Sequence, residues 1–501
     1  MAVKVGFVSL GCPKNLINTE VMLAKLAAEG FEIVAEDVDA DVIVINTCAF
    51  IESAKQEAID NILDVAWLKE NHTLRGIVVT GCLPERYREQ LLEEMPEVDC
   101  ILGTGSYGDI CEAVRSAYAK KPLARFGDVN AAPLGGERVV TTQEHFAYLQ
   151  IAEGCDNRCS YCVIPSIRGR FRSRPMGEIV EEARELAALG VRELCLVAQD
   201  TTRYGEDLYG TYALDALLRE LSAVDGIRWL RLLYCYPGRI TDGLVEEIAS
   251  NPKVVKYIDM PIQHISDRVL RAMNRRDTAA DIRSAVERLR SAVPDIVLRT
   301  TVITGFPGET EDEFEELRAF LRETRFERLG VFAYSREEGT PAYDLPDQIP
   351  EKLKRKRYDA LMREQRKIHT AYNRAQVGKT LAVVCEGYDT VSESYYGRSY
   401  ADAPDIDGRV FFSAPRRVRE GELVRVEVSE VLDYDLVGKF IGEAEYRKQT
   451  DAGQNRAGPV LCVFHHLSRV YIRAYHLVAD HRRRHLHPCR HHRFSGRQDR
   501  P

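Results

Sequence analysis

The first 120 residues alternate short apolar runs with amphipathic stretches, and this alternation restricts how the chain can fold more than any other feature. Three of the runs read VKVGFVSL, DVIVINT and GIVVTG, with the length and the β-branched content of buried strands. Each run precedes a stretch whose apolar residues have helical spacing. Strand and helix in turn predict a parallel sheet covered by helices. We therefore expect an α/β domain at the amino terminus.

The alternation resumes with a longer period between about residues 146 and 335. Six apolar runs, AYLQIA, ELCLVA, IRWLRLLY, VVKYIDM, IVLRTTVITG and LGVFAYS, are separated by helical stretches. Six successive strand and helix units predict an open or partial barrel rather than a complete eightfold one. A basic helical stretch follows, and then short alternating strands separated by Gly, Asp and Pro turns predict a small β-barrel.

A chain of 501 residues is too long for a single hydrophobic core, so several domains are expected. The patterns above place an amino-terminal α/β domain at residues 1–120 and a turn-rich linker at 121–140. A partial barrel with its helical extension follows at 141–375, and a small β-barrel at 376–443. The tail, 444–501, is rich in His and Arg and holds eight of the twelve histidines, and its biased composition predicts disorder.

Charge is distributed unevenly along the chain. The formal net charge is −8, but residues 446–501 carry 12 Lys and Arg against 3 Asp and Glu, so that the preceding 445 residues carry about −17. The first residues, MAVKVGFVSLG, lack the features of a signal peptide, and no apolar run approaches the roughly 18 residues of a membrane span. These features predict a cytoplasmic protein without a membrane partner.

Three cysteines stand immediately after the strands of the amino-terminal domain: Cys12, Cys48 and Cys82. Because parallel strands end at the same edge of a sheet, where open α/β sheets bind ligands, these three side chains can meet in space. The other interpretation is three unrelated buried thiols. Six further cysteines lack this regular placement and are interpreted as small core residues: Cys100, Cys111, Cys195, Cys235, Cys385 and Cys462.

A second trio, Cys155, Cys159 and Cys162, follows the first strand of the partial barrel. A structural zinc site needs four protein ligands, and His145 could supply the fourth. A ferredoxin-like electron carrier would supply four cysteines to a four-iron cluster. Three thiolates on such a cluster leave one iron open, and an open coordination position is where a metal centre does chemistry.

The C-x3-C-x2-C spacing and the predicted partial barrel resemble the radical S-adenosylmethionine (SAM) superfamily. The resemblance implies that the amino and carboxylate groups of SAM bind the open iron of a 4Fe-4S cluster held by the second trio, which is therefore the catalytic trio. An electron from the cluster would then cleave SAM to a 5′-deoxyadenosyl radical that attacks an unactivated C–H bond. Residues at two strand ends occupy places where this superfamily contacts SAM: Gln199, Asp200, Arg299 and Thr301.

Residues 1 to about 443 as a whole resemble the methylthiotransferases. That resemblance implies a Rossmann- or flavodoxin-like amino-terminal sheet, a partial (β/α)6 radical SAM barrel and a TRAM-like β-barrel. It also implies that Cys12, Cys48 and Cys82 hold a second 4Fe-4S cluster, whose open iron binds the sulfur that is methylated and inserted. SAM would serve both as methyl donor and as radical source.

Several stretches, among them CSYCVIPSIRG, AQDTTRYGEDLYG, LLYCYP and YIDMPIQHIS, look like the RimO branch of that family. This branch modifies the β-carbon of an aspartate in small-subunit ribosomal protein twelve. Residues 378–440 carry 12 acidic and 8 basic residues, which favours a basic protein or an assembling small subunit over direct nucleic-acid binding. A reductant such as flavodoxin or ferredoxin is also implied.

Three alternatives remain open from the sequence. The same chemistry could act on a tRNA adenosine, as in the MiaB branch. A non-enzymatic iron–sulfur or zinc protein would not cleave SAM. A plain radical methyltransferase would not need Cys12, Cys48 and Cys82.

Overall fold

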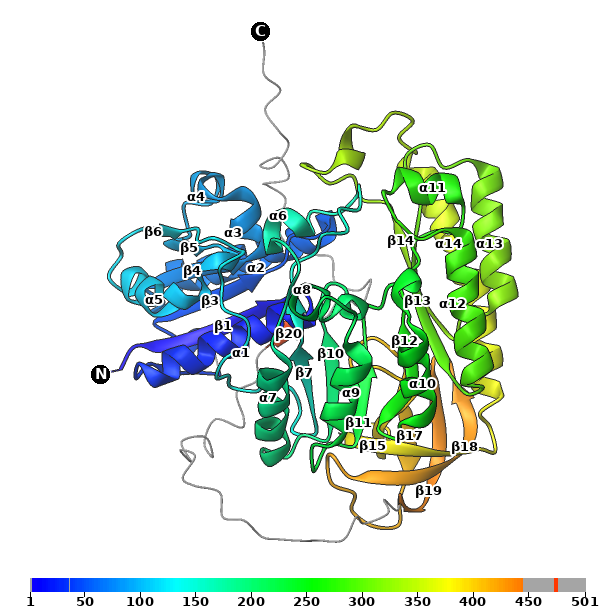
Figure 1. Ribbon diagram of the computed structural model, residues 1–501. Coiled ribbons are helices and arrows are strands. Elements are labelled where there is room, and N and C mark those ends of the chain that lie inside the picture. Colours follow the sequence, from blue (N-terminus) through cyan, green and yellow to red (C-terminus); the bar gives the residue numbers. More distant parts are fainter. Residues whose placement is uncertain (1, 36, 445–472, 476–501) are drawn as a thin grey trace. The chain divides into compact units, whose positions relative to one another are not determined.

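The computed structural model describes residues 2–35, 37–444 and 473–475, which fall into two compact units (Figure 1). Of the described residues, the first unit comprises 2–35, 37–49, 53–128 and 473–475, and the second comprises 50–52 and 129–444. Within the described residues, no helix combines the length and the apolar character needed to cross a membrane.

The first unit is built on a parallel sheet with the strand order β2-β1-β3-β4-β5-β6. Its strands are β1 (Lys4–Leu10), β2 (Glu32–Ile33), β3 (Val42–Thr47), β4 (Gly76–Gly81), β5 (Cys100–Leu102) and β6 (Leu123–Arg125). The helices between them are α1 (Pro13–Ala28), α2 (Glu52–Asn71), α3 (Cys82–Tyr87), α4 (Glu89–Glu94) and α5 (Ile110–Tyr118). Every residue of β3 and β4 is buried, as in central strands covered by helices on both faces. The predicted amino-terminal α/β fold is confirmed.

Two short strands correct the sequence-based prediction. β6 begins at Leu123, inside the stretch predicted to be a linker from residue 121 to residue 140. β20 (Arg473–Tyr475) pairs in parallel with β1, and the rest of the tail predicted to be disordered, beyond Ala444, lies outside the described residues. Strands of three residues show too little alternation to be recognised from a sequence.

The second unit contains an open six-stranded parallel sheet with the order β14-β13-β12-β11-β10-β7. These strands are β7 (Phe146–Gln150), β10 (Glu193–Val197), β11 (Trp229–Leu232), β12 (Val254–Asp259), β13 (Val297–Thr304) and β14 (Arg328–Ala333). They match the six predicted runs, so the predicted partial barrel is confirmed. A separate antiparallel pair, β8 (Ala152–Glu153) and β9 (Arg172–Ser173), follows β7.

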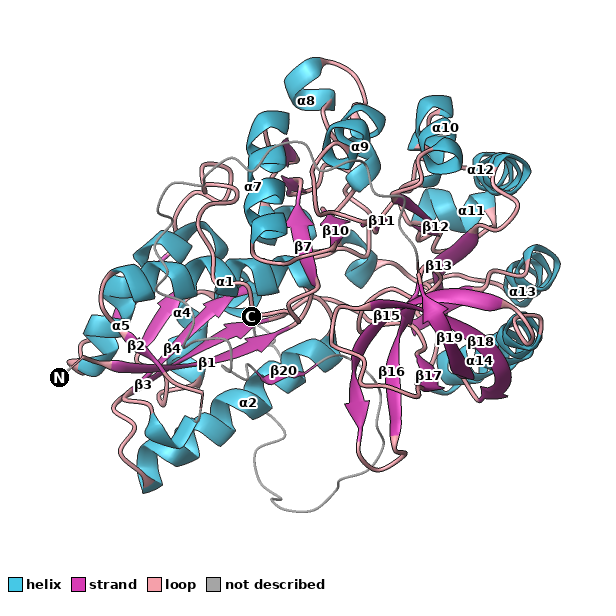
Figure 2. Ribbon diagram, turned by 90° about the horizontal axis from the view of Figure 1, so that it is seen from below, coloured by secondary structure: helices cyan, strands magenta, loops and turns pink. Residues whose placement is uncertain are grey.

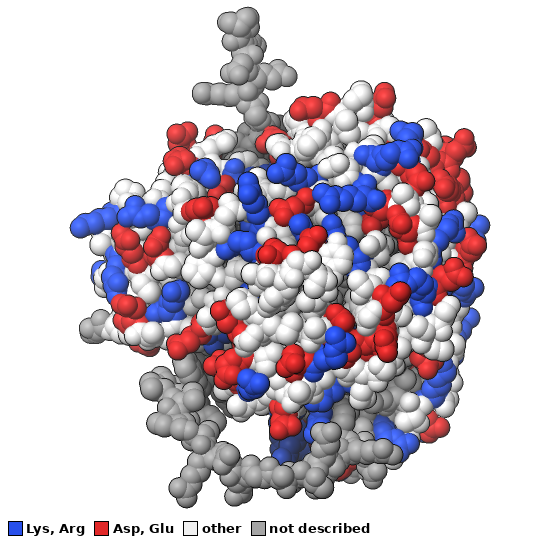
Figure 3. Space-filling model, viewed as in Figure 1, with Lys and Arg blue, Asp and Glu red and all other residues white. Residues whose placement is uncertain are grey.

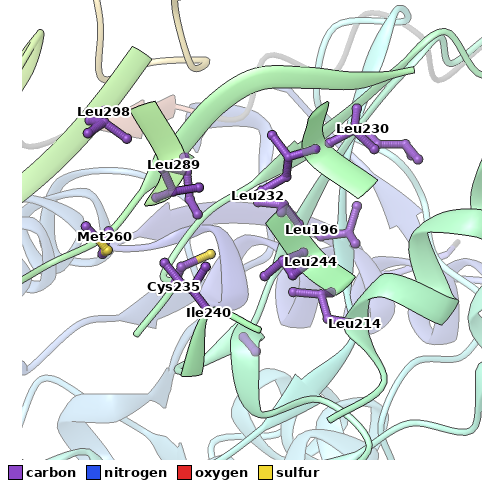
Figure 4. Close-up of a cluster of buried hydrophobic side chains, with 14 of the residues drawn as sticks. Leu196, Leu214, Leu230, Leu232, Cys235, Ile240, Leu244, Met260, Leu289 and Leu298 are labelled. Atoms are coloured by element: carbon purple, nitrogen blue, oxygen red, sulfur yellow. The ribbon is translucent and has the colours of Figure 1, made fainter. Parts of the chain in front are cut away.

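Helices cover the outer face of this sheet (Figure 2). The helices of this unit are α7 (Met176–Ala188), α8 (Glu206–Tyr209), α9 (Leu214–Ser222), α10 (Asp242–Ser250), α11 (Asp267–Ala272), α12 (Ala279–Ala292), α13 (Glu311–Thr324) and α14 (Glu351–Arg374), and the short α6 (Ile164–Arg168) follows the cysteine loop. The capping boxes of Thr278 with Asp281 and of Thr310 with Glu313 fix where α12 and α13 begin. In Figure 4, strand residues Leu196, Leu232 and Leu298 meet helix residues Leu214, Leu244 and Leu289 in one buried cluster.

A closed β-barrel ends the second unit, with the strand order β15-β16-β17-β19-β18. Its strands are β15 (Thr380–Asp389), β16 (Ser394–Ser399), β17 (Val410–Ser413), β18 (Leu423–Leu432) and β19 (Asp435–Glu443). Val424, Val426 and Val428 alternate with exposed residues along β18 and form part of the barrel core. The predicted small β-barrel is confirmed.

Charged side chains inside the partial barrel are paired with residues of this closed barrel. The Glu193 carboxylate accepts hydrogen bonds from Arg231 Nε at 2.7 Å and from Arg398 Nη2 at 2.8 Å, and none of the three side chains is more than 3% exposed. Arg328 Nη2 donates to Asp402 Oδ1 at 2.7 Å. Because a buried charge is costly unless it is paired, these contacts hold the closed barrel against β10, β11 and β14.

Replacing Glu193 with alanine would leave Arg231 and Arg398 buried without their shared carboxylate. We expect a loss of about 3–5 kcal/mol of folding free energy, measured as a lower melting temperature by circular dichroism. Glu181→Ala is the control, because Glu181 is 64% exposed and forms an ion pair with Arg184, which is 59% exposed. A control variant as unstable as Glu193→Ala would contradict the prediction.

The same variant should change the response to acid. Burial favours protonation of Glu193, but the guanidinium groups of Arg398 and Arg231 outweigh it and lower the pKa from 4.5 to about 2. The stabilisation from Glu193 is therefore complete above pH 4.5 and is lost as the pH falls toward 2. Melting temperatures measured over that interval should fall less steeply for Glu193→Ala than for the wild type.

Candidate metal centres and cosubstrate site

The first cysteine trio lies at the carboxyl edge of the amino-terminal sheet. Cys12 directly precedes α1, Cys48 directly follows β3, and Cys82 is the first residue of α3. Gly11 has a φ of 94°, and a Cβ there would lie 2.8 Å from the Cβ and 3.3 Å from the Sγ of Cys48. The Cys48 side chain thus lies against the residue before Cys12. Since β1, β3 and β4 are neighbours, the topology brings the three cysteines to one edge.

Buried hydrogen bonds join the loops that carry these cysteines. Asn15 Nδ2 donates to the carbonyl oxygens of Leu10 at 2.7 Å and Thr47 at 3.1 Å, which links the end of β1 to the end of β3. The hydroxyl of Thr47 donates to the carbonyl oxygen of Thr80 at 2.7 Å and so links β3 to β4. The ends of the three strands are therefore held in fixed positions relative to one another.

The second trio lies in the loop between β8 and α6, beyond the carboxyl end of β7. Main-chain hydrogen bonds shape this loop: Cys155 N donates to Gly169 O at 3.1 Å, and Cys162 N donates to Cys159 O at 3.0 Å. The amide of Ile164 lies 3.5 Å from Cys162 Sγ and donates to the sulfur. Such a donor stabilises negative charge on sulfur, as a thiolate ligand requires.

Burial disfavours the charged form of these thiols. It raises the pKa of Cys155 to about 11, and it raises the pKa of Cys162 as well. A buried thiol of this kind ionises at neutral pH when a cationic centre binds it. Cysteine sulfur is the ligand type of iron–sulfur clusters, so the donor sets of both trios fit such a group. Among the described residues, no three His, Cys, Asp or Glu side chains converge closely enough for one metal ion.

The structure decides against His145 as a zinc ligand of the second trio. His145 precedes β7, whereas the cysteine loop follows it, and a strand of five residues separates its two ends by about 16 Å. The His145 ring instead lies 3.4 Å from Glu386 Oε1 of the closed barrel. The zinc alternative that used His145 is therefore wrong.

Asp200 lies behind the cysteine loop rather than in the open. Its side chain is fully buried and accepts hydrogen bonds from Asn157 Nδ2 at 3.0 Å, from the Thr202 hydroxyl at 2.7 Å and from Arg239. Arg239 also donates to Asn157 Oδ1 at 3.0 Å. Asp200 was expected to bind SAM, but its oxygens face protein donors, so its side chain positions the loop that carries Cys155 and Cys159.

Gln199 remains partly exposed beside the cysteine loop. Its Nε2 donates to Glu153, whose carboxylate also accepts from Gln150 Nε2 at 2.7 Å and from the amide of Gly154 at 3.2 Å. The Gln199 Oε1 atom is buried and has no hydrogen-bond partner among the described residues. A buried acceptor is therefore left without a hydrogen-bond partner just beyond the carboxyl end of β10. Arg299 and Thr301, the other two expected contacts, lie on β13.

Sequence reasoning missed several residues that surround the second trio. Tyr236 is one, with its hydroxyl 3.9 Å from Cys159 Sγ and the guanidinium of Arg275 over its ring at 4.1 Å from the centroid. Glu153, Asn157 and Arg239 are others. Glu153 stands two residues before the cysteine motif and Asn157 within it, whereas nothing in the sequence pairs Tyr236 or Arg239 with residues about 80 positions away.

Three family models match the chain: the radical SAM superfamily over residues 149–321, the uncharacterized protein family UPF0004 over 4–103 and the TRAM domain over 377–441. Among solved structures, the radical SAM methyltransferase TsrM from Kitasatospora setae, with tryptophan and a SAM analogue bound, matches with a TM-score of 0.52 at 14% identity. That match covers 73% of this chain and 89% of the other. Fold and cysteine motif thus define a radical SAM protein.

Curated relatives extend over nearly the whole described chain. Ribosomal protein uS12 methylthiotransferase RimO of Geobacter sulfurreducens is 51% identical over 441 residues, which are 87% of this chain and 98% of the relative. RimO of Acetivibrio thermocellus is 48% identical over 452 residues, covering 89% and 100%. The chain belongs to the RimO family of radical SAM methylthiotransferases.

Replacing Asp200 with alanine would leave Arg239 and Asn157 without the carboxylate that joins them. We expect the reconstituted protein to bind less iron, with a loss on the order of the four irons of one cluster, because the loop carrying Cys155 and Cys159 is no longer held. Asp200→Asn keeps an acceptor and should lose less iron. Iron would be counted after anaerobic reconstitution, with Asp242→Ala, whose side chain is 97% exposed, as a surface control. Full iron content in Asp200→Ala would contradict the positioning role.

Proposed function

We propose that this protein transfers a methylthio group to the β-carbon of an aspartate in ribosomal protein uS12. The observation that carries this proposal is the near full-length similarity to relatives that bear the name uS12 methylthiotransferase, at 48–51% identity over 98–100% of their lengths. Substrate choice is thus inferred from the relatives, and the chemistry from the site.

In this proposal, Cys155, Cys159 and Cys162 hold one 4Fe-4S cluster, and Cys12, Cys48 and Cys82 hold a second. When bound, the clusters and SAM supply a radical that removes a hydrogen atom from the target carbon and a methylated sulfur that replaces it. The chain supplies the sulfur ligands, the Ile164 amide that donates to Cys162 and the buried surroundings that limit access of water.

The remaining residues of the site hold and orient the cysteine loop, SAM and the substrate. We assign the radical chemistry to the domain at residues 141–375 and substrate docking to the barrel at 376–443. Gln199 is the expected SAM contact that the proposal keeps, because its buried Oε1 is an acceptor without a partner among the described residues and is suited to an ammonium group. Asp200 positions the cysteine loop through Asn157 and Arg239.

The closed barrel offers a basic partner protein less acidic surface than the count of acidic residues in the sequence suggested. Three of the twelve acidic residues between 378 and 440, Glu386, Asp402 and Asp407, have side chains at most 8% exposed. On the face drawn in Figure 3, acidic and basic side chains are interspersed. Charge therefore gives little support to the choice between uS12 and tRNA. An electron donor such as flavodoxin or ferredoxin completes the set of partners.

Mass spectrometry of ribosomal proteins and tRNA nucleosides, from cells with and without the gene, tests the proposal. We expect a methylthio increment on uS12 that disappears with the gene, while tRNA nucleosides stay unchanged. A change confined to a tRNA nucleoside would overturn the substrate, and no change in either would overturn the function.

The two trios should be separable by alanine variants of the reconstituted enzyme. Alanine at Cys12, Cys48 and Cys82 should abolish methylthiolation but allow 5′-deoxyadenosine formation, whereas alanine at Cys159 should abolish both. Chromatography of 5′-deoxyadenosine and mass spectrometry of uS12 measure the two outcomes, and Cys111→Ala on α5 is the matched control. Undiminished methylthiolation without the first trio would favour a plain radical methyltransferase.

A further inference from the structure

The inner face of β13 borders accessible space. Leu298 and Val302 belong to the buried cluster that faces the helices, as Figure 4 shows for Leu298. Because side chains alternate along a strand, Arg299, Thr301 and Ile303 face the interior of the partial barrel. All three are only half-buried, in contrast to their fully enclosed neighbours.

The guanidinium of Arg299 is fixed on one side and open on the other. Its Nη1 donates to Asp259 Oδ1 at 2.7 Å, and its Nε lies 3.9 Å from Asp407 Oδ1. Its Nη2 has no hydrogen-bond partner among residues 2–35, 37–444 and 473–475, and the side chain is 18% exposed. By contrast, the side chains of Arg231, Arg328 and Arg398 are at most 6% exposed.

The carboxylates of Asp259 and Asp407 do not compete for Arg299 Nη2. Asp259 also accepts a hydrogen bond from the amide of Tyr234 at 3.1 Å, which holds it on the Nη1 side. Asp407 accepts hydrogen bonds from the hydroxyl of Tyr257 at 2.7 Å and from the amide of Ala403 at 2.9 Å. Arg299 is therefore held in place while Nη2 stays available to a ligand.

A small notch lies in front of this nitrogen because residue 330 is a glycine. A Cβ on Gly330 would lie 3.4 Å from Thr301 Oγ1, 3.7 Å from Arg299 Nη2 and 3.8 Å from Phe332 Cε2. The Thr301 hydroxyl likewise has no hydrogen-bond partner in the described part of the chain. Phe332 is 46% exposed. Two open polar groups and an aromatic edge therefore surround one point.

The notch lies toward the carboxyl edge of the strands. Asp259, the last residue of β12, pairs with Arg299, and Thr301 stands two residues further toward the carboxyl end of β13. A group bound in the notch would thus lie near the same edge of the barrel as the second trio.

We propose that Arg299 and Thr301, in the notch left by Gly330, bind the side-chain carboxylate of the substrate aspartate. A guanidinium and a hydroxyl are suited to a carboxylate, and holding it would fix the adjacent β-carbon for hydrogen abstraction. This inference rests on the proposed function. It replaces the expectation that Arg299 and Thr301 bind SAM, whose own carboxylate is the other source of this chemistry.

The test uses the reconstituted holoenzyme, SAM, and a synthetic peptide spanning the target aspartate of uS12. The readout is the ratio of methylthiolated peptide to 5′-deoxyadenosine. For Arg299→Gln we expect this ratio to fall about 10- to 100-fold, the loss that corresponds to one charge-assisted hydrogen bond. The preference for the aspartate peptide over the same peptide with asparagine should shrink by a similar factor. Arg299→Lys should recover part of both.

Gly330→Leu is a second, independent test in case the Arg299→Gln variant folds poorly. Gly330 does not have a positive φ, so a side chain can be accommodated, and leucine would fill the notch while the Arg299–Asp259 ion pair stays intact. The ratio should fall here too. Arg283→Gln, at an exposed ion pair on α12, is the matched control for loss of an arginine and should leave the ratio unchanged.

Each other outcome overturns the assignment. If peptide product and 5′-deoxyadenosine fall together, so that the ratio holds, the notch serves the SAM carboxylate or only the fold. An undiminished ratio in both Arg299→Gln and Gly330→Leu would show that the notch does not hold the substrate. A wild-type enzyme that cleaves SAM but modifies neither the peptide nor intact uS12 would instead refute the proposed function.

Discussion

The second unit depends on the pairing of Glu193 with Arg231 and Arg398, three fully enclosed side chains from β10, β11 and the closed barrel. An isolated charge in this position would be prohibitive, so the closed barrel must stay against the strands that it neutralises. Arg328 and Asp402 repeat the arrangement on the far edge of the sheet. The closed barrel is thus a separate sheet, but its buried ion pairs make it necessary for the stability of the partial barrel.

Strand β10 runs from these ion pairs to the candidate metal centre. Glu193 begins the strand, and Gln199 and Asp200 follow its end, at the edge where the cysteine loop lies. Charged pairs fill the amino ends of these strands and the cysteine loop lies at the carboxyl end, so the stabilising ion pairs and the candidate metal centre occupy opposite ends. Asp200 lies at the carboxyl end, where its fully buried carboxylate holds Asn157 of the cysteine loop.

Sequence reasoning was correct where the signal was local and periodic. The six strands of the partial barrel, the amino-terminal sheet and the small barrel followed from apolar runs of strand length. It was wrong about His145, which lies at the opposite end of β7 from the cysteines. Asp200, expected to contact SAM, is enclosed by protein donors. The count of acidic residues between 378 and 440 also overstated the negative charge on the barrel surface, because Glu386 and Asp402 form buried ion pairs.

The sequence by itself determined the order of strands and helices, the three-part architecture and the positions of both cysteine trios. These follow from hydrophobic periodicity and from spacing along the chain, which are properties of neighbouring residues. Only the tertiary structure decided which carboxylate meets which guanidinium, and that Arg299 keeps one nitrogen open beside Gly330. Those contacts join residues tens to hundreds of positions apart, and they exist only once packing has excluded water and fixed each side chain against its partner.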